Sequence, residues 1–330
     1  MLASFLAVPN LDLATLSDNM RWRQDLIAMY NSLRLKLGDQ VFSKAVVGED
    51  GWIFYTGEFS IPDYQNSAPF SEERLKSIQQ ALDQLNSDLE KQGRTLLVVI
   101  APNKSTIYAQ HMPAEIPVLG DRSRLDQFTE YMREHGSTRV IDLRQALVSA
   151  SREQEVYYKV DTHWNEMGAY YAYREILDAL SVRDPRLQSH PLSDFEYTFM
   201  QYNINPDLPR ALGLPVFAEP RWKLMPRFPI QEVTVVGRIT VSSNREVLTL
   251  EGTQENLPSL LVYHDSFYAA YGGLSHLIEP NFRRTVTVPF VAEPGIWSLD
   301  WIQKEDPDIV IIEVVERYLN LTLPKLLGLN

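Results

Sequence analysis

The sequence predicts one α/β domain in which helices cover the faces of a mostly parallel β-sheet. Two observations support this fold class. Apolar segments typical of buried strands alternate with amphipathic segments typical of helices, which is the order expected for a parallel sheet with helical connections. In addition, 45% of the 330 residues are hydrophobic, so the chain can bury a sizeable core.

A helical lead-in is expected at residues 1–45, before an α/β domain at residues 46–330. In the lead-in, apolar side chains recur at helical spacing between Trp22 and Leu37. The domain then opens at residues 46–55 with two short apolar segments on either side of a glycine turn, a pattern that indicates a pair of strands.

Predicted helices and strands alternate through the body of the domain. The best defined helix lies at residues 71–93, because Ser71 can cap its start, acidic residues fill its first turn and Gly93 can end it. Further helices are expected at residues 123–134, 165–180 and 267–277. Strands are expected at residues 96–100, 139–143, 260–263, 285–290 and 309–315.

An insertion at about residues 183–258 is expected to interrupt this alternation. Residues 183–230 hold many of the prolines and show little periodicity, so we expect an irregular connection there. Residues 231–250 have the pattern of a β-hairpin, with its turn at Ser243 and Asn244.

The composition excludes several classes of function. The chain carries 43 acidic and 31 basic residues, a net charge of −12, which argues against nucleic acid as a partner. It contains no cysteine, which excludes disulfides, cysteine nucleophiles and zinc–thiolate sites. No apolar run reaches the ~18 residues that a membrane-spanning helix needs. This composition is compatible with both the periplasm and the cytosol.

The first candidate site contains Asp161 and His163, just before the predicted helix at residues 165–180. In an extended segment, side chains two residues apart leave on the same side, so Asp161 can orient the imidazole of His163. Of the six histidines, His163 is the one with an acid two residues away at a strand–helix junction. The alternative is structural, with Asp161 capping a turn and His163 a hydrogen-bonded core residue.

The second candidate is Ser266, which follows a predicted buried strand and begins a predicted helix. Open α/β sheets bind ligands beyond the carboxyl ends of their strands, so Ser266 and His163 can converge there. A serine hydroxyl needs such a base to act as a nucleophile. The backbone N–H groups of Ser266 and the next residue could hold an oxyanion. The alternative is a plain helix cap.

Two further strand ends carry polar residues that could bind a substrate carboxylate or hydroxyl. Asn103 and Lys104 follow the predicted strand at residues 96–100, and Arg317 and Tyr318 follow the last strand. The alternative is that these residues form surface salt bridges and a half-buried tyrosine.

A metal centre is not expected. Asp161, His163, His264 and Asp265 could be combined as a mixed nitrogen and oxygen site. His264 and Asp265 are neighbours on a strand, however, so their side chains should point to opposite faces. Glycine-rich phosphate loops are also absent from the sequence, and we expect no cofactor.

At this point the chain resembles a known family, the periplasmic alginate O-acetyltransferases, which are SGNH-hydrolase-like proteins with a DxHW motif. The matching segments occur in the family's order and span about residues 46–319. They are VGEDGWIF at residues 47–54, APNKSTIY at 101–108, DTHW at 161–164 with Gly168 and Ala169 behind it, HDSF at 264–267 and EVVERYL at 313–319.

The resemblance implies a three-layer α/β/α SGNH-like fold in permuted order, with the Asp/His pair before the serine. It places Asp161, His163 and Ser266 on the family's catalytic positions, and Arg317 and Tyr318 near the family's site. The chain departs from typical SGNH enzymes in one respect. The glycine and asparagine blocks that supply their oxyanion donors cannot be placed here, so the second donor is unassigned.

The resemblance also implies a function. It is acetylation of hydroxyls on a secreted or cell-surface polysaccharide through an acetyl-serine, with a membrane-bound O-acyltransferase as acetyl donor. We therefore expect a periplasmic protein, tethered to the inner membrane by an N-terminal segment absent from this sequence. Two alternatives are a carbohydrate acetylesterase with the same triad and a non-catalytic polysaccharide-binding scaffold of an export complex.

Overall fold

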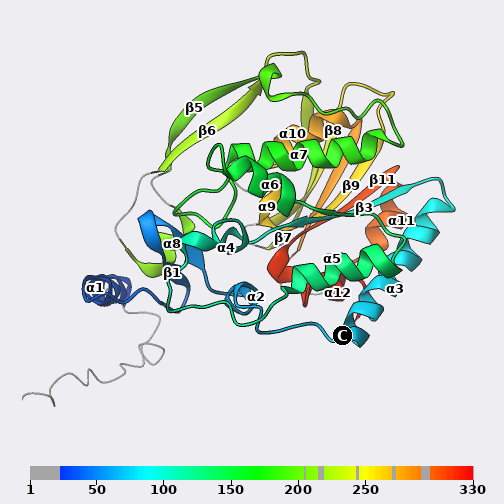
Figure 1. Ribbon diagram of the computed structural model, residues 1–330. Coiled ribbons are helices and arrows are strands. Elements are labelled where there is room, and N and C mark those ends of the chain that lie inside the picture. Colours follow the sequence, from blue (N-terminus) through cyan, green and yellow to red (C-terminus); the bar gives the residue numbers. More distant parts are fainter. Residues whose placement is uncertain are drawn as a thin grey trace, which may run out of the picture.

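A seven-stranded sheet forms the centre of the molecule (Figure 1). The computed structural model describes residues 23–203, 206–214, 219–242, 245–269, 273–290 and 298–329. The strand order is β4-β3-β11-β9-β10-β8-β7. The bounds in that order are Val140–Asp142, Thr95–Ala101, Ile309–Val315, Ser259–His264, Arg284–Pro289, Arg245–Gly252 and Val233–Ser242.

The first five strands of this order run parallel. β8 is antiparallel to β10, and the outer strand β7 is antiparallel to β8. All residues of β9 and β11 are buried. Strands buried on both faces are typical of a parallel sheet covered by helices. The predicted α/β fold with a mostly parallel sheet is therefore confirmed.

Two hydrophobic cores lie on opposite faces of the sheet. Side chains alternate between them along each strand, so that Leu97 belongs to one core and Leu96 to the other. The first core contains side chains of α6 (Arg144–Ser151) and α7 (Glu166–Ser181). The second is covered by α3 (Glu72–Glu90), α5 (Arg124–His135), α11 (Asp300–Glu305) and α12 (Thr322–Leu326). The result is the expected three-layer arrangement.

The starts of the long helices follow from their capping residues. The Ser71 hydroxyl accepts a hydrogen bond from the Arg74 N–H at the start of α3. Ser123 forms a capping box with Asp126 at the start of α5. The Asn165 side chain accepts from two N–H groups in the first turn of α7. Each cap satisfies N–H groups that have no partner inside the helix.

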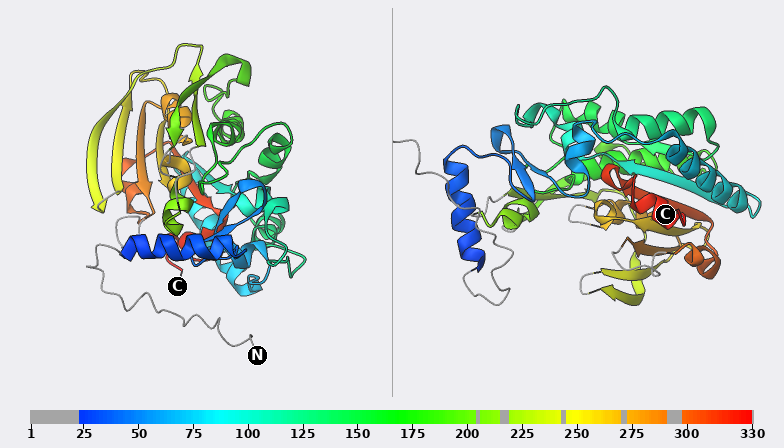
Figure 2. Two further views of the ribbon diagram at one scale, coloured as in Figure 1. Left: turned by 90° about the vertical axis from the view of Figure 1, so that its left-hand side faces the viewer. Right: turned by 90° about the horizontal axis from the view of Figure 1, so that it is seen from below.

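A small subdomain lies at the N-terminal side. It contains α1 (Arg23–Lys36), an antiparallel pair of β1 (Ala45–Val47) and β2 (Ile53–Tyr55), and α8 (Asp207–Leu212). The Asn31 side chain donates to the Leu212 carbonyl at 2.7 Å, and α1 lies beside α8 at one end of the molecule (Figure 2). Among the helices that the structure describes, none is long and apolar enough to cross a membrane. The division at residue 45 stays a prediction.

The expectation of an irregular connection at residues 183–230 is wrong. β5 (Phe195–Asn203) and β6 (Glu219–Pro226) pair as an antiparallel two-stranded ribbon, with α8 between them in sequence. The prolines of β6, Pro220 and Pro226, lie near its two ends, where a missing N–H is tolerated.

The predicted hairpin is present as β7 and β8, and its expected turn at Ser243 and Asn244 lies outside the described residues. The insertion bounds stay a prediction. The helix expected at residues 267–277 is replaced by two short helices, α9 (Ser266–Ala269) and α10 (Ser275–Ile278). The remaining short elements are η2 (Glu49–Gly51), α2 (Ser60–Tyr64), α4 (Lys104–Ile107), η3 (Ala109–His111), η4 (Leu192–Asp194), η5 (Glu279–Asn281) and η6 (Glu316–Tyr318).

Candidate active site

A tight loop before α7 carries Asp161 and His163. Its two ends are joined by a β-bridge between Tyr157 and Trp164, and the Tyr158 N–H donates to the His163 carbonyl at 3.2 Å. The rings of Tyr157 and Trp164 are fully buried. The loop is therefore anchored on the core, and its tip presents the acid and the histidine.

Ser266 begins α9 directly beyond the end of β9, near the middle of the sheet. The side chain of Asp265 fixes this turn, because its two oxygens accept from the N–H groups of Phe267 at 2.8 Å and Val315 at 2.6 Å. The Asp265 N–H in turn donates to Glu313 Oε2 at 3.1 Å. Burial raises the pKa of the Asp265 carboxyl.

Asp161, His163 and Ser266 form one continuous chain of hydrogen bonds. His163 Nε2 lies 2.8 Å from Ser266 Oγ, and His163 Nδ1 lies 2.7 Å from Asp161 Oδ1. Burial raises the pKa of Asp161, but the hydrogen bond and charge of His163, with the charge of Arg221, outweigh it and bring the pKa to about 2. An ionised acid, a bridging imidazole and a hydroxyl in this geometry can deprotonate the hydroxyl.

The second oxygen of Asp161 faces residues that the sequence analysis missed. Arg221 Nη2 of β6 lies 3.5 Å from Asp161 Oδ2, and the Asp207 N–H of α8 donates to the same oxygen at 3.4 Å. Glu219 of β6 accepts from the backbone N–H groups of Lys159 and Val160 at 2.6 and 3.2 Å. No local motif marks these residues, because their partners lie about 45 to 60 positions away in the chain.

Lys104 lies beneath the same loop and is buried. Its ammonium group donates to the carbonyls of Tyr158, Lys159 and Asp161 at 3.1, 3.0 and 2.7 Å. An ammonium group has three N–H donors, so these contacts take the place of the substrate contact expected from the sequence. Burial lowers the pKa of Lys104 to about 8, although the nearby acids act in the opposite direction.

Asn103 and Arg317 line a small hollow next to this loop, and Tyr318 lies beside Arg317 without lining it. Arg317 Nη1 donates to Asn103 Oδ1 at 3.2 Å, and Arg317 Nε donates to Glu58 Oε2 at the same distance. The Arg317 guanidinium also lies 5.4 Å from the centre of the Tyr318 ring. The hollow has a volume of about 10 Å³, and Asn103, Lys104 and Arg317 line it. This is about the space of one water molecule.

One expectation about the oxyanion donors is wrong. The N–H of Phe267 donates to Asp265 Oδ1, so it does not face the space in front of Ser266. The Ser266 N–H is the remaining one of the two backbone donors that the sequence analysis proposed. The Phe267 N–H therefore stabilises the turn that positions Ser266 and does not bind an oxyanion.

The metal alternative combines different residues from those expected. Asp161, His163 and Asp207 offer ligand atoms within 4.8 Å of one another in the described part of the chain. His264 and Asp265 are engaged elsewhere, since His264 Nδ1 bonds the Asp265 carbonyl and both Asp265 oxygens accept backbone N–H groups. Both ring nitrogens of His163 already take part in hydrogen bonds, to Asp161 Oδ1 and to Ser266 Oγ, so a cation bound through His163 would displace one of them.

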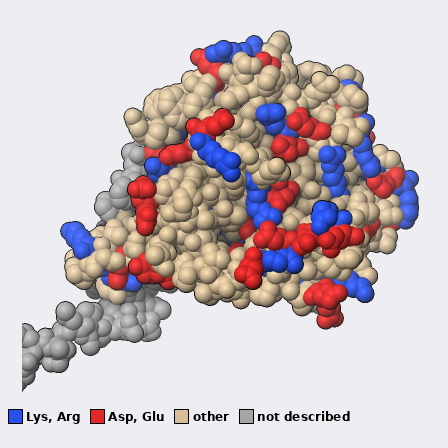
Figure 3. Space-filling view, in the orientation of Figure 1, with Lys and Arg blue, Asp and Glu red and all other residues tan. Residues whose placement is uncertain are grey.

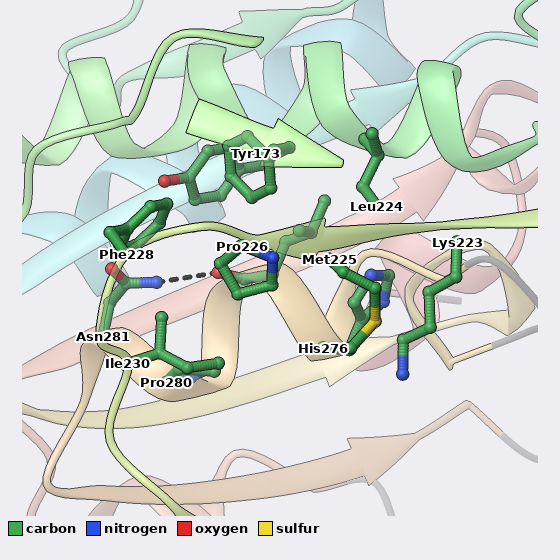
Figure 4. Close-up of a pocket in the computed structure, with 12 residues that line it drawn as sticks. Tyr173, Lys223, Leu224, Met225, Pro226, Phe228, Ile230, His276, Pro280 and Asn281 are labelled. Atoms are coloured by element: carbon green, nitrogen blue, oxygen red, sulfur yellow. Dashed lines mark hydrogen bonds between the residues drawn. The ribbon is translucent and has the colours of Figure 1, made fainter. Parts of the chain in front are cut away.

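A larger apolar cavity lies farther along β6 (Figure 4). Its volume is about 200 Å³, and its walls include Tyr173 of α7, Met225 of β6 and Leu277 of α10. His276 lines it as well, with Nε2 3.2 Å from Glu166 Oε2. None of the triad residues lines this cavity.

Comparisons with known proteins identify the family of this chain. A family model described as SGNH hydrolase-like domain, acetyltransferase AlgX, matches residues 45–241, which include Asp161 and His163 and end before Ser266. The probable alginate O-acetylase AlgJ of Pseudomonas syringae pv. tomato is 28% identical over 163 residues, 49% of this chain and 40% of that protein. Its counterpart in Pseudomonas aeruginosa is 27% identical over 150 residues, 46% of this chain and 36% of that protein. The matches thus span less than half of these relatives.

Solved structures show the same fold. The O-acetyltransferase domain of Pseudomonas putida AlgJ matches with a TM-score of 0.58 at 18% identity, over 86% of this chain and 99% of that one. PatB1 of Bacillus cereus matches with a TM-score of 0.60 at 16% identity, over 84% and 98%. Because the family model covers more than half of the sequence, the chain belongs to the family of SGNH hydrolase-like domains of the acetyltransferase AlgX.

Proposed function

We propose that this protein is an O-acetyltransferase that moves an acetyl group onto a hydroxyl of a polysaccharide through an acetyl-Ser266 intermediate. The observation that carries the proposal is the hydrogen-bonded chain from Asp161 through His163 to Ser266, at the carboxyl edge of the parallel sheet. Family membership and relatives named as alginate O-acetylases support acetyl transfer to a polysaccharide.

In the first half-reaction, His163 Nε2 takes the proton of the Ser266 hydroxyl while Oγ attacks the acetyl carbonyl of the donor. The Ser266 N–H stabilises the oxyanion of the tetrahedral intermediate. The donor's acyl bond then breaks, and its leaving group takes the proton from His163. Asp161 keeps the imidazole oriented and stabilises its positive charge.

In the second half-reaction, a sugar hydroxyl attacks the acetyl-serine carbonyl. His163 takes the hydroxyl proton and returns it to Ser266 Oγ as the ester bond to the serine breaks. The products are the acetylated sugar and the free enzyme. Water can take the place of the sugar, so the acetylesterase alternative differs only in its acceptor.

The resemblance to alginate O-acetylation proteins supports the cellular setting of this proposal. A membrane-bound O-acyltransferase would hand over the acetyl group, since acetyl-CoA does not reach the periplasm. The protein would then act in the periplasm, held at the inner membrane by an N-terminal segment, on a polysaccharide that is being exported.

Mass spectrometry of the intact protein tests the proposal. After brief exposure to an activated acetyl ester, the wild type should carry one acetyl group on Ser266, and Ser266→Ala and His163→Ala should carry none. Circular dichroism should show that all three proteins are folded. A folded wild type without adduct or turnover would contradict the triad and favour the non-catalytic scaffold. Comparing acetyl transfer to oligosaccharides with hydrolysis separates the transferase from the esterase.

A further inference from the structure

Four aromatic rings form a continuous surface on the ribbon of β5 and β6. We call Tyr197, Phe199, Tyr202 and Trp222 the aromatic platform. Tyr197, Phe199 and Tyr202 are 43%, 43% and 59% exposed. The Tyr197 ring stacks on Trp222 with centres 5.0 Å apart and planes at 13°, and Phe199 meets Trp222 edge-on at 5.4 Å.

A β-bulge in β5 keeps the Tyr202 ring on the same face as the other three rings. In a regular strand, Phe199 and Tyr202 would point to opposite faces, because they are three residues apart. The pairing of β5 with β6 shifts between Phe199 and Gln201, which adds one residue and restores the alternation. The two rings accordingly lie 5.3 Å apart. Rings gathered at a surface in this way, and not buried in the core, mark a binding surface.

The strand β6, which carries Trp222 of the platform, also contacts the loop that holds Asp161. Arg221, the residue before Trp222, faces Asp161 from the opposite side of β6. Glu219 of the same strand holds the N–H groups of Lys159 and Val160 in the catalytic loop. At the same end of the loop, the ring of Tyr158 lies 4.9 Å from the Arg221 guanidinium. A molecule resting on the platform is thus held by the same strand that supports Asp161.

The chemistry of this surface fits a sugar chain. The C–H bonds on the flat face of a pyranose ring stack on aromatic rings, while the sugar hydroxyls stay in water. In the view of Figure 3 the surface over β5 and β6 is mostly uncharged. A net charge of −12 favours no polyanion, so the contact that these rings offer is stacking and not ion pairing.

We propose that the aromatic platform binds the acceptor polysaccharide by stacking against its sugar rings, on the same ribbon that supports Asp161. The inference rests on the proposed acetyl transfer, and it adds where the acceptor binds. The platform plays no part in taking the acetyl group from the donor.

The experiment compares the two half-reactions in wild type, Phe199→Ala, Tyr202→Ala and the double variant. With an activated acetyl ester alone, the rate of Ser266 acetylation should stay within about twofold in all four proteins, because the triad contacts are intact. Transfer from acetyl-serine to long alginate oligosaccharides should show KM raised by roughly three- to tenfold for each lost ring, the size of an aromatic stacking contact. Tyr30→Ala on α1 is a matched control, since Tyr30 is also exposed, at 41%.

Direct binding keeps the two proposals apart. Affinity electrophoresis in gels containing alginate or a neutral glucan should retard wild type and Tyr30→Ala, and retard the double variant less. If no protein forms an acyl-enzyme but this difference persists, the acetyl-transfer proposal fails and the platform remains a glycan site. Equal transfer and equal retardation in all variants would overturn the platform. So would a wild type that binds neither glycan, or ring-dependent binding to phosphatidylcholine vesicles in place of glycan.

Discussion

Lys104 shows how far residue-level prediction reaches in this protein. Its position at a strand end was visible in the sequence, but its partners are backbone carbonyls of Tyr158, Lys159 and Asp161, which leave no sequence signal. The contact between Asp161 and His163 was predicted from an extended segment, but the two residues lie in a tight loop, so the pairing is present and the expected backbone is not. Ser266 was predictable, since a buried strand followed by a helix marks a ligand edge.

Replacing Lys104 with methionine should slow acetylation of Ser266 by about 10- to 100-fold, because the loop that holds His163 loses its three anchoring hydrogen bonds. KM for a small ester should change little, since Lys104 is buried and donates only to the loop. Rapid-mixing kinetics with an activated acetyl ester measures both. A normal acetylation rate in the variant would show that the loop keeps its shape without the ammonium group.

Stability measurements on the same variant test the ionisation of Lys104. Burial lowers its pKa from 10.5 to about 8, so between these values the unfolded chain binds more protons than the folded one. The free energy of unfolding therefore increases with pH across this window. In urea unfolding, we expect the free energy of unfolding of the wild type to rise relative to that of Lys104→Met between pH 8 and pH 10. A constant difference would contradict the lowered pKa.

At the scale of elements, the ribbon of β5 and β6 is what the sequence did not predict. Its prolines and its bulge after Phe199 obscure the two-residue alternation that identifies strands. The long helices α3, α5 and α7 and the buried strands, by contrast, were predicted within a few residues of their observed bounds, whereas α6 was not predicted. The missed ribbon carries Arg221 and Glu219, so the support of the triad was missed with it.

Replacing Arg221 with methionine should lower the rate of Ser266 acetylation by about tenfold. The reason is that Asp161 loses a cation 3.5 Å from its second oxygen, and its ability to stabilise a protonated His163 depends on its own charge and orientation. Arg238→Met is the matched control, since Arg238 pairs with Glu246 on an exposed face of β7. Equal acetylation rates in the two variants would show that Arg221 does not contribute to catalysis.

At the scale of the whole molecule, the parallel sheet unites residues that are 103 positions apart, His163 and Ser266. Ser266 follows a strand of the sheet, as the rule for parallel strands predicts, whereas His163 comes from the loop between α6 and α7 and not from the expected strand–helix junction. The rule says nothing about which segment covers that edge, so the roles of Asp207 and Arg221 required the structure.

The central strands should dominate the stability of the domain. Leu261→Ala in β9 removes a fully buried side chain between two layers and should cost about 2–5 kcal/mol in free energy of unfolding. Val236→Ala in the edge strand β7 is the control, because Val236 is 52% exposed and should cost under about 0.5 kcal/mol. Urea unfolding followed by tryptophan fluorescence measures both. Similar losses would indicate that the sheet is not the centre of cooperative folding.

The adjacency of Arg221 and Trp222 has a consequence for how such a protein can diverge. The two side chains leave opposite faces of one strand, so the acceptor surface can be altered by substitution without touching the support of Asp161. A deletion or insertion of one residue between the start of β6 and Arg221 is different, because it turns every following side chain over. Trp222 would then face Asp161, and Arg221 would face the sugar. Substitutions in this strand can therefore change the glycan preference while the triad keeps its support. Changes in the length of the strand cannot.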